Sequence, residues 1–484
     1  MSLESTAFAP TLTVLSDADR QRIYRAALQV LAHAGMTVQH DIAVKRLTGA
    51  GCRLTDNDSI TVPEALVEKS IASAPANIAL FNRQGDPVMD VGGRRSYFGT
   101  GSDLMAHING RTWDRAATCL ESVGRSARLC DALPNIDFIM SFAIPNDIDP
   151  QRANVESFLA MVVNAIKPMV TIADDRGELE VMWEIAKVLR GGEARLRQKP
   201  YFVHLSGPIS PLRHPFKSID KLIFCAEKAV PVIYCPAPIA GSTAPMTIAG
   251  HVVQGLAECL FGLVVHQLTV PGAPFIMGMG PAVLDMATSQ CSYNAPEFLM
   301  AYTAVVEMSN ALDIPNWGYA GTTDAQVPDG QAFYEAGLLT YLSVVTGSNL
   351  NHDVGYFDFA RAGSLEMVVI MDEVIDQIRR MHKGIEIDED QLAVEVIAQG
   401  ARQGHFLTQP HTLKHLRRTQ WRPRLICRRG YDRWTREGRT TIMQRAHDRV
   451  AHILATHQPA ALPADRLAAI SRITDNHARR VDRR

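Results

Sequence analysis

The feature of the sequence that most constrains the fold is a series of short, continuously apolar segments that alternate with longer amphipathic ones. Continuous apolar residues are typical of strands that are covered on both faces, as in a parallel sheet. In the intervening segments the apolar residues recur at three- and four-residue steps, which indicates helices with one buried face. The eight short segments begin at Tyr97, Asp137, Pro168, Tyr201, Val230, Pro274, Asn316 and Asn349.

Eight strands that alternate with helices predict an α/β fold, a (β/α)8 TIM barrel. This order implies parallel pairing through right-handed crossovers, and residues 364–383 are expected to form the eighth helix. An open doubly wound sheet is the alternative. It is disfavoured because no GxGxxG follows the first strand and because the number of strands fits closure.

The barrel domain is predicted to occupy residues 96–384, with additional structure on either side. Residues 1–95 are interpreted as an N-terminal α+β cap, in which a helix starts after Ser16 and a turn at Gly85 and Asp86 indicates a hairpin. Residues 385–484 are interpreted as a C-terminal helical extension. Its tail from Gly430 is rich in arginine, which we interpret as a solvated face or a subunit contact in preference to a binding patch.

The charge balance disfavours two classes of partner. The chain has 49 Lys and Arg against 51 Asp and Glu, so its net charge of −2 gives no reason to expect nucleic acid or an anionic membrane. No signal peptide is predicted, because the first residues lack a charged segment followed by an apolar core. The most apolar stretch, residues 252–265, contains Glu258 and is too short to span a bilayer. We therefore expect a cytoplasmic protein, and a homo-oligomer is compatible with a barrel of this size.

In a barrel of this type the active site lies at the carboxyl-terminal ends of the strands. Lysine and arginine are nearly absent from these ends, which disfavours Schiff-base and phosphate chemistry. Aromatic rings and carboxylates without cations accept a positive charge, because aromatic faces attract quaternary ammonium groups. The residues at these ends are Thr100, Ser102, Asp103, Asn146, Asp147, Asp174, Asp175, Ser206, Cys235, Thr322, Thr323, Asp324, His352 and Asp353, with the aromatic Tyr97, Phe98, Trp317, Tyr319, Tyr356 and Phe357.

Each of these residues also has a structural explanation. Aromatic residues in strands usually serve packing, which applies to Tyr97 and Trp317. His352 could be a hydrogen-bonded core histidine. Asp324 could cap a helix, although the next helix is expected to begin only near Asp329. Their combination on one rim favours a functional site.

Metal binding is not predicted. None of the eight cysteines forms a CxxC pair, so a thiolate zinc site is disfavoured. His411 and His415 are four residues apart and share one helical face, the spacing of a metal-binding pair. No HExxH motif provides a general base beside them, and we favour a structural role at a helix end.

Three long segments carry a resemblance to a known family. Residues 99–117 (GTGSDLMAHINGRTWDRAA), 323–375 and 383–417 are similar to the trimethylamine methyltransferase (MttB-like) superfamily. The most specific pattern is the succession DEVI, GIEIDED, GHFL and HTLKH in the last two segments. The similarity extends from the N-terminal cap to about Gly438.

The resemblance implies a TIM barrel that transfers a methyl group from an amine to the cobalt of a separate corrinoid protein. The chain itself would hold no permanent cofactor, and the cobalamin would come with the partner. Founding members of the family contain pyrrolysine in the region corresponding to residues 318–331, where this chain has only standard residues. Family members without pyrrolysine include glycine betaine demethylases. The resemblance therefore implies a quaternary trimethylammonium substrate, such as glycine betaine or a similar betaine.

For such a substrate we expect an aromatic wall. Tyr97, Tyr356 and Phe357 are expected to form it, with Trp317 and Asp103 as further substrate-binding residues. The aromatic faces would attract the ammonium group without donating a hydrogen bond to it.

Three further residues are expected to act on the substrate's orientation. His352 is expected to contact its carboxylate end, directly or through water. Asp324 and Gln331 lie in the region that corresponds to the pyrrolysine and are expected to orient either end.

Other functions remain open on the sequence alone. A barrel that binds a betaine without transferring a methyl group fits equally well, because the nucleophile belongs to another protein. A trimethylamine-type methyltransferase is a second alternative. A lyase or aldolase would use Asp and His for acid–base chemistry and would turn over without cobalamin. The scarcity of lysine at the strand ends weakens an aldolase but not a metal-dependent lyase.

Overall fold

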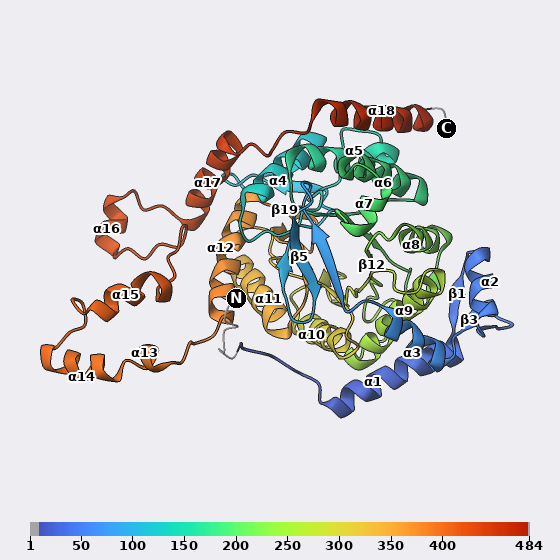
Figure 1. Ribbon diagram of the computed structural model, residues 1–484, viewed down its shortest axis with the longest axis horizontal. Helices are drawn as coiled ribbons and strands as arrows, with labels where there is room; N and C mark the ends of the chain where they lie inside the picture. Colours follow the sequence, from blue (N-terminus) through green and yellow to red (C-terminus); the bar gives the residue numbers. More distant parts are fainter. Residues whose placement is uncertain (1–8, 483–484) are drawn as a thin grey trace.

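The chain folds around a barrel of parallel strand segments (Figure 1). The computed structural model describes residues 9–482, so residues 1–8, on which the signal-peptide prediction partly depends, lie outside the described residues. Two parallel ladders make up most of the barrel, with the orders β13-β12-β10-β9 and β16-β17-β6. Their strands are β6 (Tyr97–Phe98), β9 (Met169–Thr171), β10 (Phe202–Ser206), β12 (Val232–Tyr234), β13 (Phe275–Met277), β16 (Trp317–Tyr319) and β17 (Leu350–His352).

Single parallel bridges join the two ladders into a ring. On one side Met277 of β13 pairs with Asn316, next to β16. On the other side Phe138 pairs with Gly99, and the adjacent Ile139 pairs with Met169 of β9. The second predicted strand therefore contributes bridges, and the other seven predicted segments contribute full strands. The predicted TIM barrel is confirmed.

One helix follows each strand segment and covers the outside of the ring. Several begin with a side-chain cap, in which Asp149, Asp175, Asp329 and Ser364 accept a hydrogen bond from a backbone N–H of the first turn. The predicted eighth helix is present as α12. The helices are α4 (Leu120–Ala132), α5 (Pro150–Asn164), α6 (Arg176–Arg190), α8 (Phe216–Lys228), α9 (Ile248–Thr269), α10 (Pro296–Ala311), α11 (Gly330–Thr346) and α12 (Leu365–His382), with the short α7 (Glu193–Gln198) after α6.

A hairpin of β4 (Asn77–Phe81) and β5 (Pro87–Gly92) fills the amino-terminal end of the barrel. Its inward side chains alternate with exposed ones, as expected of a strand pair with one buried face. The inward residues pack against the side chains that point into the barrel from the surrounding strands. The members of this cluster are Ile78, Leu80, Met89, Val91, Phe138, Met140, Val170, Val203, Ile233, Ile276, Trp317 and Leu350.

The remaining N-terminal elements lie against the outside of the barrel. α1 (Asp17–Gln29) and α3 (Glu64–Ser73) contact α9, as does α2 (Asp41–Gly49). A small sheet has the order β11-β1-β3-β2 and takes β11 (Arg213–His214) from a barrel loop. The N-terminal region thus shares a sheet with the barrel, and the division at residue 95 stays a prediction. Its other elements are the π-helix η1 (Val30–Ala34), β1 (Met36–Val38), β2 (Arg53–Leu54) and β3 (Ser59–Thr61).

Helix α9 is longer than the apolar stretch identified in the sequence. Its 22 residues, Ile248–Thr269, are long and apolar enough to cross a membrane by length and composition alone. Most of it is nevertheless buried, against α1, α3, α8 and α10. The carboxylate of Glu258 accepts hydrogen bonds from Ser210 and from the backbone N–H of Leu212. The apolar character of α9 is therefore explained by packing on both sides.

Two small sheets lie beyond the carboxyl-terminal ends of the strands, the edge of the barrel that we call the mouth. The first, here the mouth sheet, has the order β18-β19-β7-β8 and joins the loops after β6 and β17. Its strands are β7 (Ala106–Ile108), β8 (Arg115–Ala117), β18 (Tyr356–Phe357) and β19 (Ala362–Gly363). The second is the pair β14 (Val283–Leu284) and β15 (Cys291–Ser292), which follows β13.

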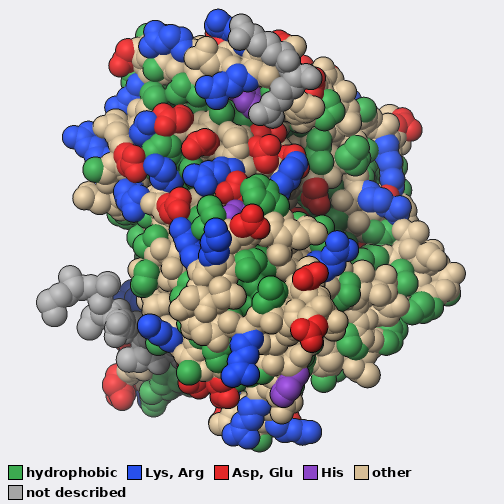
Figure 2. Space-filling model, turned by 90° about the vertical axis from the view of Figure 1, so that its right-hand side faces the viewer, with side chains coloured by type: hydrophobic (Ala, Val, Ile, Leu, Met, Phe, Trp, Pro, Cys, Tyr) green, Lys and Arg blue, Asp and Glu red, His purple; other side chains and the backbone are tan. Residues whose placement is uncertain are grey.

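The C-terminal extension has two parts. The elements α13 to α16 project from the side of the barrel, and α17 and α18 return to it (Figure 1). Helix α17 packs on α12 and α4, and α18 packs on α6 and α5. Figure 2 views the right-hand side of Figure 1 and shows cationic and acidic side chains interspersed there, in keeping with the balanced charge. The helices are α13 (Glu389–Leu392), α14 (Val394–Gln403), α15 (Pro410–Thr419), α16 (Tyr431–Arg436), α17 (Ile442–Thr456) and α18 (Ala464–Val481).

We expect the Leu80→Ala substitution to destabilise the protein, because Leu80 of the hairpin is buried against the barrel interior. The cavity left by such a truncation costs about 2–5 kcal/mol. The measurement is the fall in melting temperature by calorimetry. The control is Val88→Ala on the exposed face of the same hairpin, which should change stability by no more than about 0.5 kcal/mol. Equal effects of the two substitutions would contradict the role of the hairpin as a packed plug.

Candidate functional site

Two carboxylates from opposite ends of the barrel sequence meet at the mouth. Asp103 follows β6 and Asp353 follows β17, and these strands are paired in parallel through Leu350 with Tyr97 and Asn351 with Phe98. Because parallel strands end at the same edge, their following loops lie side by side. The hydroxyl of Tyr356 joins the two loops: it lies 3.1 Å from Oδ1 of Asp103 and accepts from the Asp103 backbone N–H at 3.2 Å.

Asp353 is held in a conformation that few residues other than glycine adopt. Its φ is +71°, and its carboxylate is buried. Glycine is required at position 101, because a Cβ there would stand 2.3 Å from both the Asp353 carboxylate and the Tyr356 hydroxyl. Burial, together with the nearby charge of Asp103, raises the pKa of Asp353 well above its usual range. The site therefore disfavours the ionised form of Asp353, which keeps its proton to a higher pH than an exposed carboxyl group does.

Asp103 forms the exposed edge of this carboxylate pair. Its side chain reaches solvent although protein surrounds it on most sides. That surrounding protein raises the pKa of Asp103, while the hydrogen bond from Tyr356 acts in the opposite direction. Asp103 is therefore the group of the pair that solvent can reach.

His352 is neutral and lies between Asp353 and the aromatic rings. Its Nδ1–H donates to the carbonyl oxygen of Gly318 at 2.6 Å, so Nε2 carries a lone pair. This Nε2 lies 3.4 Å from Oδ1 of Asp353. Burial lowers the pKa of His352 to about 3, although the bond to Gly318 opposes the shift. An acceptor nitrogen facing a carboxyl group is favourable when Asp353 keeps its proton, which agrees with the raised pKa of Asp353.

Tyrosine rings form the wall of the site. The ring of Tyr319 lies 4.5 Å from that of His352 and 6.0 Å from that of Tyr293. Burial raises the pKa of both tyrosines, and the charges of Asp353 and Asp103 raise it further. We call the six residues Asp103, Tyr293, Tyr319, His352, Asp353 and Tyr356 the mouth cluster.

The structure places the predicted substrate-binding residues at different levels of the barrel. Asp103 and Tyr356 belong to the mouth cluster. Trp317 lies below it, fully buried, with its ring 4.2 Å from that of His352. Phe357 follows Tyr356 in β18 and is fully buried, and both residues belong to the main hydrophobic core.

Tyr97 does not lie at the mouth. It begins β6, at the amino-terminal end of the barrel, and its hydroxyl accepts from the backbone N–H of Asp90 in the hairpin at 3.1 Å. The prediction that Tyr97 belongs to the aromatic wall is therefore wrong in position. The prediction of a strand at Tyr97 is confirmed. Tyr97 is the first residue of that strand, however, and the mouth lies beyond its last residue.

The structure assigns Asp324 a local role. Its buried carboxylate accepts from the Ser292 hydroxyl and from the backbone N–H groups of Tyr293 and Asn294. Burial raises the pKa of Asp324, and the Ser292 bond lowers it. Asp324 thus fixes the loop that brings Tyr293 to the mouth cluster, and its expected role in orienting a ligand stays a prediction.

Gln331 and His352 also differ from their expected roles. Gln331 is exposed on the first turn of α11, where its amide donates to Glu335 at 2.9 Å. His352 belongs to the mouth cluster, but its Nε2 is an acceptor. A neutral acceptor does not bind a carboxylate, so the geometry does not support the expected contact with that end of a substrate.

Sequence reasoning missed Tyr293 and underrated Asp353. Tyr293 lies in the loop between β15 and α10, where the strand-end rule selects no residue. Asp353 was recognised at a strand end but not placed in the substrate site. The GlyTyr-aromatic run that follows it indicates a tight turn, and that is the signal that could have identified it.

The mouth cluster is suited to a cation. The causes that shift the pKa of Asp353 are burial and another carboxylate, with no lysine or arginine among them. Aromatic faces and unpaired carboxylates both attract positive charge. Within residues 9–482, the group with the spacing of metal ligands lies elsewhere, in the C-terminal extension.

We expect the Asp353→Asn substitution to raise stability at neutral pH. The pKa of Asp353 is higher in the folded chain than in the unfolded chain, so the folded state binds more protons and stability falls as the pH rises from about 4 through the raised pKa. Asparagine removes this charge and also tolerates positive φ.

The measurement is the melting temperature of the wild type and of Asp353→Asn between pH 5 and pH 8. The advantage of the variant should grow with pH. Asp114→Asn, at an exposed position of the turn between β7 and β8, is the matched control and should show no such trend. A variant that loses stability relative to the wild type as the pH rises would contradict the assignment.

Comparisons with known proteins agree with this architecture. The family model described as trimethylamine methyltransferase (MTTB) matches residues 4–482. The trimethylamine methyltransferase MttB of Desulfitobacterium hafniense (strain DSM 10664 / DCB-2) is 28% identical over 95% of this chain and 93% of its own length. The glycine betaine methyltransferase of Desulfitobacterium hafniense (strain Y51) is 29% identical, over 94% of each chain.

The solved structures support the fold. A crystal structure of the hydroxylamine complex of MtmB superimposes with a TM-score of 0.53, at 14% identity, over 91% of this chain and 88% of that one. At this identity the similarity shows the fold alone. The match of the family model over nearly the whole length confirms the resemblance noted in the sequence: the chain belongs to the trimethylamine methyltransferase family.

Proposed function

We propose that this chain transfers a methyl group from a quaternary trimethylammonium compound, glycine betaine or a similar betaine, to the Co(I) of a cognate corrinoid protein. The observation that carries the proposal is the mouth cluster, in which the carboxyl groups of Asp103 and Asp353 lie among His352 and tyrosine rings. A permanent cation is the ligand that would stabilise the ionised forms of both carboxyl groups. Membership of the family supports the reaction type.

Quaternary ammonium suits this site better than a neutral amine. It carries its charge at every pH, and it cannot donate a hydrogen bond, so ring faces are its natural partners. A bound cation would lower the pKa of Asp103 and Asp353, allowing both carboxylates to ionise. The absence of pyrrolysine from residues 318–331 supports the same choice, since the chain lacks the residue with which founding members treat a neutral amine.

The reaction requires little chemistry from the chain itself. Co(I) of the acceptor supplies the nucleophile, and the carbon–nitrogen bond breaks with its electron pair passing to nitrogen. The amine leaves in its neutral form, so no side chain has to provide a proton, in agreement with the neutral His352. The contribution of the chain is to position the methyl group and to exclude water.

The strength of the cation site has an upper limit. Positive charge disperses from the substrate as the methyl group leaves, so a site that held the bound cation too tightly would raise the barrier. The raised pKa of Asp353 moderates the attraction, because the carboxyl group stays protonated until a cation is bound. The cluster thus combines the exposed carboxylate of Asp103 with the buried carboxyl group of Asp353, which would lose its proton when a cation binds.

The carboxylate end of a betaine would need a cationic partner. Arg115 of β8 and Arg361 of the loop before β19 both pair with Asp358, at 2.6 Å and 3.0 Å. They belong to the mouth sheet, and they are the side chains that we propose for the carboxylate end. The acceptor would approach where Asp103 is exposed.

The proposed reaction belongs in the cytoplasm. All eight cysteines are unpaired, as expected in a reducing compartment. Co(I) is itself strongly reducing and requires such conditions. The partners of the proposed reaction are a small quaternary amine and a cobalamin-carrying protein. A homo-oligomer stays a prediction from the size of the barrel.

The test is a panel of amines incubated with reduced corrinoid protein and this chain, scored by the absorption of methyl-cobalt. We expect transfer from glycine betaine or a homologue and none from trimethylamine. Transfer from trimethylamine alone would favour the alternative of a trimethylamine methyltransferase, which is the name of the relative from Desulfitobacterium hafniense strain DSM 10664 / DCB-2. Binding without methyl-cobalt would indicate a betaine-binding protein, and turnover without cobalamin would indicate a lyase.

Two substitutions locate the site. Tyr319→Leu removes an aromatic face, and a cation–π contact of about 1–2 kcal/mol corresponds to a roughly 5- to 30-fold loss of substrate affinity. Tyr334→Leu, at an exposed position of α11, is the matched control and should leave affinity unchanged. Affinity is measured by calorimetric titration in the absence of the corrinoid protein, and equal affinities of the two variants would remove the mouth cluster from the proposal.

A further inference from the structure

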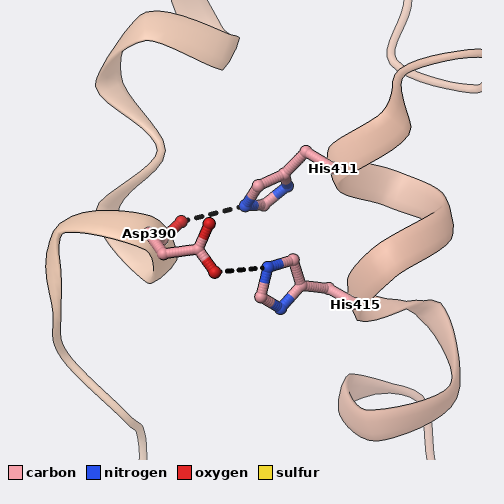
Figure 3. Close-up of side chains that lie close together, drawn as sticks. All are labelled: Asp390, His411 and His415. Atoms are coloured by element: carbon pink, nitrogen blue, oxygen red, sulfur yellow. Dashed lines mark hydrogen bonds and ion pairs between the residues drawn. The ribbon is translucent and has the colours of Figure 1, made fainter.

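A cluster of potential metal ligands lies in the C-terminal extension, outside the mouth cluster. Asp390 belongs to α13, and His411 and His415 lie on α15 (Figure 3). One ligand atom from each of the three side chains can be chosen so that all lie within 4.8 Å of one another. The two histidines are four residues apart and present their rings on the same side of α15, with ring centroids 4.2 Å apart.

We propose that Asp390, His411 and His415 bind a divalent transition-metal ion, of the class represented by Zn²⁺. Two imidazoles and one carboxylate form a donor set that first-row transition metals accept, leaving further positions for water. The proposal is independent of the methyl-transfer reaction. For His411 and His415, the sequence alone favoured a structural role at a helix end, and the proposal replaces that role with metal binding.

The geometry of the three side chains already resembles a coordination sphere. Two ligands bound at about 2.0–2.2 Å to one ion stand roughly 3.0–3.5 Å apart. Nε2 of His415 lies 2.9 Å from Oδ2 of Asp390. That nitrogen is buried and, apart from this ion pair, has no hydrogen-bond partner. Nε2 of His411 lies 2.9 Å from the backbone oxygen of Asp390, a contact that it would exchange for a bond to the ion.

A neighbouring amide can set the tautomer that metal binding requires. The side-chain amide of Gln391 lies 3.4 Å from Nδ1 of His415. Rotation of this amide by half a turn exchanges its nitrogen and oxygen, so that its oxygen accepts from Nδ1–H and leaves the lone pair on Nε2. Outer partners of this kind orient metal-binding histidines in known sites.

The extension has a physical need for such a link. Helix α13 has no buried residue, and the buried residues of α14 and α15 are Gly400 and His415. Small units without an apolar core are commonly held by a disulfide or a metal. The contacts between α13 and α15 that the structure shows are polar ones around Asp390. A metal ion there would join two helices that hydrophobic packing does not hold.

Lys414 competes with the ion for the same carboxylate. Its Nζ lies 2.7 Å from Oδ2 of Asp390, and its side chain is 63% exposed. Such a side chain can move into solvent when an ion enters. Removal of Lys414 should therefore strengthen metal binding, an effect that a simple network of ion pairs does not predict.

The test uses the full chain, stripped with a chelator and titrated with Zn²⁺ in competition with a chromophoric chelator. We expect one Zn²⁺ per chain in the wild type. His411→Ala, His415→Ala and Asp390→Asn should each weaken binding by at least about tenfold, the loss that even an outer partner causes in metal sites. Lys414→Gln should tighten it. His405→Ala, at an exposed histidine of the same extension, is the matched control and should bind as the wild type does.

Two further measurements keep the outcome decisive. Bound Co²⁺ should show visible absorption bands that change in His415→Ala, and Zn²⁺ should slow proteolysis between α13 and α15 in the wild type but not in that variant. Circular dichroism verifies that each variant keeps its fold. Absence of stoichiometric Zn²⁺ binding in the wild type, or undiminished binding in a His411→Ala and His415→Ala double variant, would overturn the proposal.

Discussion

The pairing of the last barrel strand with the first is the interaction on which the functional architecture depends. β17 and β6 form only a short ladder, and buried asparagines reinforce it: Asn349 donates to the backbone oxygens of Gly93 and Arg95, and Asn351 donates to that of Tyr97. Such buried amides are stable only when their hydrogen bonds are made. Because this seam closes, Asp103 and Asp353 meet although 250 residues separate them in the chain.

The same seam creates a conflict between stability and function. Two carboxylates are brought together where burial raises the pKa of both, and one of them has a positive φ. Strain of this kind is stored at sites where binding or chemistry relieves it. A cationic substrate would relieve the electrostatic part, so ligand binding and the stability of the mouth are expected to be coupled.

The two ends of the barrel are built for different purposes. The amino-terminal end is filled by the hairpin of β4 and β5, whose side chains continue the apolar interior. The mouth instead combines polar groups with tyrosine rings, held by loops and by the mouth sheet. Farther out, helices α13 and α15 have almost no buried residue, and polar contacts around Asp390 join them. The apolar packing at the amino-terminal end thus contrasts with the polar and aromatic residues of the mouth.

The sequence by itself determined the order of strands and helices, the class of fold and the family. Strands covered on both faces need continuous apolar residues, and helices with one buried face need apolar residues at helical spacing. Both patterns can therefore be identified from the sequence alone. Which side chains meet at the mouth was decided by tertiary structure. Tyr97 lies at the opposite end because it is the first residue of β6, where its hydroxyl bonds to the hairpin. Phe357 is fully buried in the main core, a packing that apolarity alone does not distinguish from a place in the wall of a site. Tyr293 reaches the site only through the loop that Asp324 fixes, a long-range arrangement that no local pattern records.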